Sequence, residues 1–122
     1  MGVVIIDNKI TRENVAIARE EYSSYIKITA DIVQKIIAVG GQFHADAEEV
    51  LTSKYGSVSK NIWGGGYSIK RKVFETNALL NIKPGINESS EILDSNKRND
   101  FLNLVKEKLS EIETLIWLTN RL

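Results

Sequence analysis

The sequence contains no cysteine, and it has one histidine and one proline among 122 residues. Without cysteine there is no disulfide framework, thiolate zinc site, iron–sulfur cluster or cysteine nucleophile. We therefore expect a protein that folds without cross-links in a reducing, cytoplasmic compartment.

The sequence also lacks an excess of charge of either sign and any long apolar run. Sixteen basic side chains balance sixteen acidic ones, so the formal net charge is zero. Nucleic acids and anionic membranes bind basic surfaces, and this balance argues against both as partners. No apolar run approaches the roughly 20 residues of a membrane span, and residues 1–9 lack the pattern of a signal peptide.

The composition that remains fits one globular domain over residues 1–122. Hydrophobic side chains make up 43% of the chain, which is enough for one core at this length. Hydrophobic periodicity then predicts the elements. They are a strand at Val3–Ile6, a helix from Arg12 to about Tyr22, strands at 25–32 and 36–44, a helix at Ala45–Lys54, strands at 62–67 and Val73–Lys83, and a helix from Lys97 to about Asn120.

Several of these predictions rest on local chemistry. Thr11 is placed to cap the first helix, and Gln34-Lys35 to turn the chain between two strands. Isoleucines four residues apart leave a long helix through Val39 as an alternative to that hairpin, and a strand at 45–54 is an alternative to the short helix. The fold class we expect is α+β, a single-layer, mainly antiparallel sheet with the helices on one face.

Histidine and acidic residues are close together near the middle of the chain. The only imidazole, His44, is followed by Asp46 and Glu48. Such a group can hold a divalent metal or act as a base with its orienting acid. The spacing is not that of a metallopeptidase helix, and a solvated helix start capped by His44 explains the same residues.

Amide side chains gather further along. Asn77, Asn81 and Lys83 would project from one face of the strand predicted at 73–83, and Asn87 follows the turn at Pro84-Gly85. Amides around one ammonium can orient a carboxylate or phosphate, which predicts a small anionic ligand. An ordinary solvent-facing strand surface is the alternative.

The last helix carries a broad apolar seam. Apolar residues recur every three or four positions from Leu102 to Ile116, and Trp117 follows. Packing against the sheet explains the seam, and its remainder could form a homodimer through the C-terminal helix.

Three stretches of the sequence form distinct motifs, which are Ala38–Glu48, Gly56-Ser57 with Trp63-Gly64, and Asn81–Pro84 followed by Asn87. Together they resemble an uncharacterised bacterial family of unknown function, whose pattern includes AVGG-x-LHAD-x-E. The resemblance implies kinship and no activity. This chain departs from the pattern at Ser59, Asn61 and Gly66, and where the family has arginines it has Lys83, Glu88 and Ser90. If those arginines bind an anion, that capacity is weakened here.

These observations favour a small cytoplasmic binding or interaction domain with a polar site at His44–Glu48 and Asn81–Asn87. The alternative is a metal-dependent, hydrolase-like enzyme that uses His44, Asp46 and Glu48. No cofactor is identified, no metal site is assigned, and the question of catalysis stays open. The candidate ligand-binding residues are His44, Asp46, Glu48, Trp63, Asn77, Asn81, Lys83 and Asn87.

Overall fold

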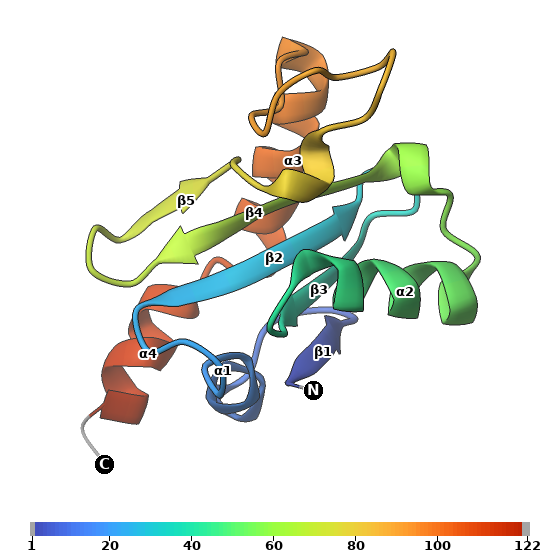
Figure 1. The fold of residues 1–122 in the computed structure, drawn as a ribbon. Coiled ribbons are helices and arrows are strands. Elements are labelled where there is room, and N and C mark those ends of the chain that lie inside the picture. Colours follow the sequence, from blue (N-terminus) through green and yellow to red (C-terminus); the bar gives the residue numbers. More distant parts are fainter. Residues whose placement is uncertain (1, 121–122) are drawn as a thin grey trace.

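A computed structural model describes residues 2–120 as one antiparallel sheet with helices on both faces (Figure 1). The strands are β1 (Val3–Ile6), β2 (Tyr25–Asp31), β3 (Ile36–Gly40), β4 (Ile62–Ser68) and β5 (Val73–Glu75), in the spatial order β1-β3-β2-β4-β5. The helices are α1 (Arg12–Ala18), α2 (His44–Tyr55), α3 (Ser95–Lys108) and α4 (Ile112–Asn120), with short 3-10 turns η1 (Ser59–Asn61) and η2 (Leu79–Asn81). The α+β class is confirmed.

The β2–β3 hairpin is confirmed, and the long-helix alternative is wrong. Ile28 pairs with Val39 and Ala30 with Ile37, so the alternating side chains keep a common register. The Asp31 carboxylate closes the turn by accepting the N–H groups of Val33 and Gln34, each at 2.9 Å.

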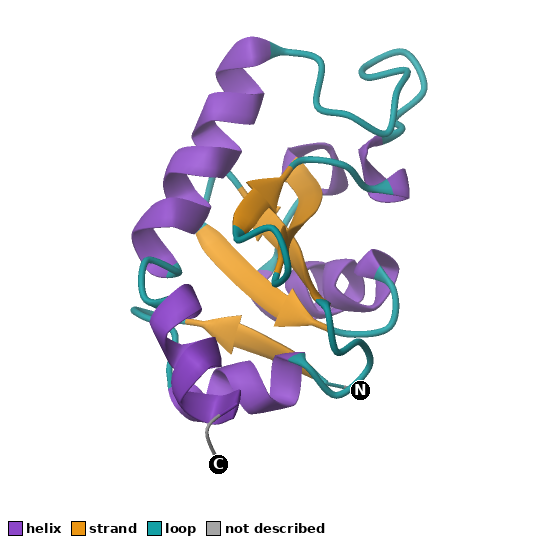
Figure 2. Cartoon of the chain, turned by 90° about the vertical axis from the view of Figure 1, so that its left-hand side faces the viewer, coloured by secondary structure: helices purple, strands orange, loops and turns teal. Residues whose placement is uncertain are grey.

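Helices cover both faces of the sheet, whereas the sequence predicted one. A Cβ added to Gly64 would meet His44 of α2, and one added to Gly65 would meet Phe101 of α3. Successive strand residues point to opposite faces, so α2 and α3 lie on opposite sides (Figure 2). The face of β2 expected to be solvated is buried instead, because Ala47 and Leu51 of α2 pack on it.

The second face matters for function because it carries α2. That helix begins at His44 and ends at Tyr55, and Gly56 caps it with a φ of 67°, the left-handed stop expected for glycine. The helix predicted at 45–54 is therefore confirmed. The strand predicted to run to His44 ends at Gly40 instead, because Gly40 and Gly41, with φ of 89° and 93°, turn the chain into α2.

The strand predicted at Val73–Lys83 is wrong beyond Glu75. After β5 the chain forms only isolated bridges, Asn77 with Glu91 and Lys83 with Asn87, around the turn η2. Asparagine side chains bond to neighbouring backbone here and replace the ladder of a strand. Asn77, Asn81 and Lys83 consequently do not share a strand face.

Two helix predictions also change in length. Thr11 caps α1 as expected, in a reciprocal capping box with Asn14, but the helix ends at Ala18 rather than Tyr22. The last helix breaks at residues 109–111 into α3 and α4. α3 packs on the sheet through Phe101, and α4 packs beside α1 (Figure 2). Within residues 2–120, no helix is long and apolar enough to cross a membrane.

Candidate functional site

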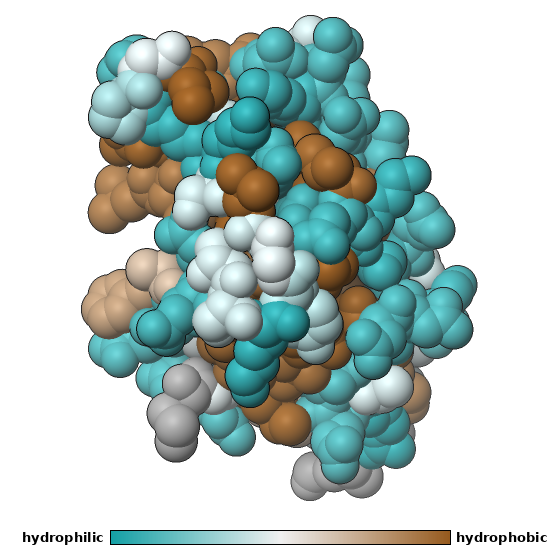
Figure 3. All heavy atoms as spheres, turned by 90° about the vertical axis from the view of Figure 1, so that its right-hand side faces the viewer, coloured by the Kyte–Doolittle hydropathy of each residue, from teal (hydrophilic) through white to brown (hydrophobic). Residues whose placement is uncertain are grey.

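A hollow of about 440 Å³, called here the His44 cleft, lies between β2, the start of α2 and the segment around η2. Its lining residues are Tyr25, Lys27, Phe43, His44, Ala45, Asn77, Ala78, Leu79 and Leu80. Polar side chains, among them Lys27 and His44, line one part of the cleft, and Leu79, which is 80% exposed, belongs to its apolar wall. Figure 3 shows apolar side chains scattered among polar ones on the face that carries α2.

His44 is held with one ring edge on the sheet and the other turned away from it. Its Nε2 lies 2.8 Å from the carbonyl oxygen of Gly65. A carbonyl only accepts, so Nε2 carries the ring proton and donates it. The Cδ2–Cγ edge lies over Gly64, where an added Cβ would be 2.9 Å from Cδ2. The opposite edge, with Nδ1, therefore faces away from β4.

The surroundings of His44 favour a neutral imidazole. Burial lowers the pKa of His44 below its usual 6.5, and the positive charge of Lys27 lowers it further, although the hydrogen bond to Gly65 opposes both effects. A neutral ring with its proton on Nε2 has a lone pair on Nδ1. His44 is thus an acceptor or a nucleophile at neutral pH.

Lys27 lies on the face of β2 that carries α2, because Ile26 and Ile28 beside it point into the main core. Its ammonium is 5.0 Å from the centroid of the Tyr22 ring and 5.8 Å from that of Tyr25. Two aromatic faces hold this cation at the cleft without neutralising it.

The acidic residues next to His44 point elsewhere. The Asp46 carboxylate accepts the backbone N–H of Phe43 at 3.1 Å, which closes the first turn of α2. Glu48 acts on Lys83, whose pKa burial lowers and the Glu48 charge partly restores. Among residues 2–120 no three His, Cys, Asp or Glu side chains form a group that could hold a metal. The alternative of a metal-dependent hydrolase has no ligand set in this geometry.

Asn81 is completely buried and bonds only to backbone. Its Oδ1 accepts the N–H of Gly64 at 2.8 Å, and its Nδ2 donates to the carbonyls of Gly64, Thr76 and Ser90 at 2.9, 3.1 and 2.9 Å. The side chain thus ties β4 to both ends of the segment that forms one wall of the cleft.

Asn87 does the same within the following loop. Its Nδ2 donates to the carbonyls of Asn81, Ser89 and Glu91, and its Oδ1 accepts the N–H of Leu93 at 3.0 Å. Asn81 and Asn87 therefore form one connected scaffold, and neither lines the His44 cleft.

Lys83 and Trp63 lie together, apart from the cleft. The Lys83 ammonium is 5.0 Å from the centroid of the Trp63 ring and donates to the carbonyls of Ser59 and Leu80 at 3.0 and 3.4 Å. Trp63 is buried in the main core. Lys83 and Glu48 line a neighbouring, more open hollow of about 570 Å³, which meets the His44 cleft at Leu79 and Leu80.

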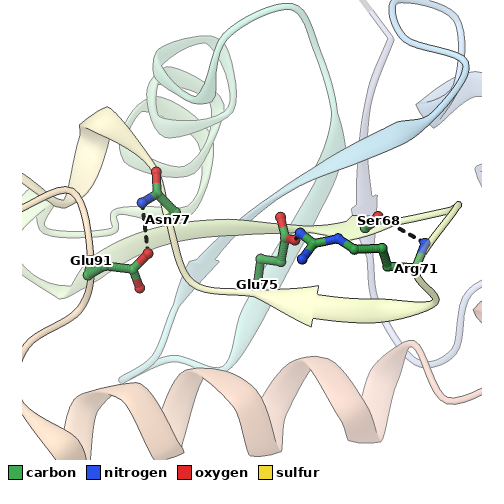
Figure 4. A network of polar contacts seen from close by, with 5 residues as sticks. All are labelled: Ser68, Arg71, Glu75, Asn77 and Glu91. Carbon is green, nitrogen blue, oxygen red and sulfur yellow. Dashed lines mark hydrogen bonds and ion pairs between the residues drawn. The ribbon is translucent and has the colours of Figure 1, made fainter.

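Asn77 is the predicted amide that does line the cleft. Its Nδ2 donates to Glu91 at 2.7 Å, and Figure 4 shows this contact beside the ion pair of Arg71 with Glu75. Arg71 also donates its backbone N–H to Ser68 at 3.2 Å. Arg71, Glu75 and Glu91 line a neighbouring hollow, which Tyr25 and Asn77 share with the His44 cleft.

The structure thus brings His44 and Asn77 to one cleft and assigns Asn81, Asn87 and Asp46 to backbone support. Sequence reasoning missed Lys27, Tyr25 and the leucines of η2. Lys27 stood out only as a polar residue in an alternating strand, and its proximity to His44 depends on α2 packing over β2.

The chain matches a family of proteins of unknown function, DUF5674, over residues 4–108. The protein belongs to the DUF5674 family. The DUF5674 match includes every residue that lines the His44 cleft and ends with α3, so α4 lies outside it. The resemblance to a family of proteins of unknown function is confirmed, whereas the motif pattern and the bacterial origin stay predictions. No curated protein and no solved structure matches the chain.

Proposed function

We propose that this DUF5674 protein binds a small anionic ligand in the His44 cleft, with a phosphate or carboxylate at Lys27 and an apolar group against Leu79 and Leu80. The observation that carries the proposal is that Lys27 and a neutral, tautomer-fixed His44 face one hollow of about 440 Å³. None of the described residues lining it is acidic. An anion there meets the positive charge of Lys27, and the adjacent carboxylates of Asp46 and Glu91 are each held by a hydrogen bond, from Phe43 and Asn77.

The start of α2 adds to this attraction. His44 is the first residue of a 12-residue helix, and the unpaired N–H groups of a first turn favour negative charge. The rest of the wall, Phe43, Leu79 and Leu80, favours an apolar substituent on the ligand. The preferred class is therefore a monoester or acid with a hydrocarbon part.

The contributions of the phosphate and of the apolar group can be separated by comparing phenyl phosphate with phenol and with inorganic phosphate. The resonance of the single histidine reports binding by NMR, since no other imidazole interferes. We expect phenyl phosphate to shift the His44 signal at lower concentration than inorganic phosphate, and phenol to leave it unchanged. Lys27→Gln should abolish the phenyl phosphate shift, whereas Lys106→Gln, on α3 across the sheet, should not. Equal titrations of Lys27→Gln and wild type would refute the proposal.

The cytoplasmic location and the homodimer stay predictions. A hollow of about 290 Å³ lies between the β4–β5 hairpin and α4, lined in part by Tyr67, Ile69 and Trp117. Trp117 is 56% exposed, which supports the expectation that α4 contributes to a dimer. Light scattering across a concentration series tests it, and a constant monomer mass would exclude the homodimer.

A further inference from the structure

The chemistry of His44 extends beyond reversible binding. Its Nε2 is occupied by the Gly65 carbonyl, and no described residue hydrogen-bonds Nδ1. The edge of the ring that carries Nδ1 faces away from β4, and His44 is one of the residues that line the cleft. The ring therefore offers one nitrogen, with its lone pair, to whatever occupies the cleft.

The surroundings of Nδ1 suit a phosphoryl group. Lys27 supplies a cation on the same hollow, and His44 opens α2, whose first turn favours negative charge. The two nearest acids along the chain are turned to other contacts: Asp46 accepts from Phe43, and the Glu48 charge acts on Lys83. A dianion on Nδ1 would be attracted by its neighbours.

The Gly65 carbonyl favours both the attachment of a phosphoryl group to His44 and its transfer onward. A phosphoryl group on Nδ1 with the proton kept on Nε2 makes the ring an imidazolium, and the Gly65 carbonyl stabilises that proton at 2.8 Å. A protonated ring is the better leaving group, so the adduct would be able to pass its phosphoryl group on.

We propose that His44 Nδ1 is a phosphoryl acceptor that takes the group from a small donor with a good leaving group, such as an acyl phosphate or a phosphoramidate. The Nδ1 lone pair forms the N–P bond, the P–O or P–N bond breaks, and the leaving group departs with that electron pair. The proton stays on Nε2 throughout and is donated in a hydrogen bond to the Gly65 carbonyl. This inference rests on the anion site proposed above.

The test treats tag-free protein with phosphoramidate, from which ammonia leaves, and follows ³¹P NMR. Long-range ¹H–¹⁵N correlation identifies the substituted nitrogen. The chain has a single histidine, so the folded and urea-unfolded forms compare one site with and without its surroundings. We expect substitution at Nδ1 in the folded protein, faster than in the unfolded chain. Loss of the Lys27 charge should slow it by about tenfold, and Lys106→Gln should leave the rate unchanged.

Substitution at Nε2, or a folded rate no higher than the unfolded one, would overturn the inference. Binding of phenyl phosphate is measured on the same sample. If phenyl phosphate still shifts the His44 resonance, only the transfer is refuted and the binding site stands. If it does not, the anion site fails together with the inference that rests on it.

Discussion

Replacing Asn81 by alanine should remove the side-chain hydrogen bonds that tie the loop walling the His44 cleft to β4. The side chain accepts the Gly64 N–H and donates two protons, which are shared among three carbonyl oxygens. At about 0.5–1.5 kcal/mol for each of these three protons, Asn81→Ala should lower the free energy of unfolding by about 2–4 kcal/mol. The value should fall at the upper end, since the Gly64 N–H stays buried in β4 without its acceptor.

Urea unfolding followed by circular dichroism measures this change, with Asn99→Ala as a control. Asn99 is exposed on α3, so its replacement should alter stability by no more than about 0.5 kcal/mol. The slope of the unfolding free energy against urea should stay constant if both forms expose the same surface. A loss below about 1 kcal/mol for Asn81→Ala would refute the reasoning, because it would mean that these hydrogen bonds are replaced by water at no cost.

Asn81→Asp sharpens the same prediction. An aspartate keeps the acceptor for Gly64 but faces the carbonyls of Thr76 and Ser90 with a negative charge. Its pKa in the folded protein should therefore exceed its unfolded value of about 3.9. The stabilising contribution of the protonated carboxyl group introduced at position 81 is then fully present below the unfolded pKa and is lost as the pH rises through the folded pKa. The deficit against wild type should be larger at neutral pH than in acid, and a pH-independent deficit would contradict this.

Three further outcomes follow from single contacts. The chemical shift of the His44 Cε1 proton should report a pKa below the usual 6.5, because burial lowers the pKa of the imidazole. The free energy of unfolding should rise with pH between the folded pKa and 6.5, and the urea midpoints of His44→Gln should lack that rise. Gly65→Ala should cost at least about 2 kcal/mol or prevent folding, because the new Cβ runs into the carbonyl of Glu75; a normal melting temperature would contradict it. Thr11→Ala should cost about 1 kcal/mol through loss of the cap of α1, which Thr11→Ser should largely restore in the same melts.

Hydrophobic periodicity located β2, β3 and α2, although it did not show that both faces of β2 are buried. The hairpin followed from the alternation of Ile26, Ile28 and Ala30, which face the core, and α2 followed from Gly56, which supplies its left-handed stop. These signals are local, because each depends on residues within one or two turns of chain.

The failures lie where distant contacts decide. Nothing in the alternation of Val73–Lys83 reveals that Asn81 bonds to Gly64, a contact that draws the chain away from a strand. No glycine or proline marks the break between α3 and α4, which follows from their packing on different partners. His44 was recognised from its residue type, whereas Lys27 required the crossing of β2 under α2.

The three glycines of β4 leave the sheet without side chains beside His44, so groups on its two faces come close together. Phe101 of the main core reaches to Gly65 from one side, and the imidazole donates to the same residue from the other. A single peptide unit thus separates the cleft from the hydrophobic interior. A fluorine probe on the Phe101 ring would therefore report the charge state of His44 from a position that no ligand touches.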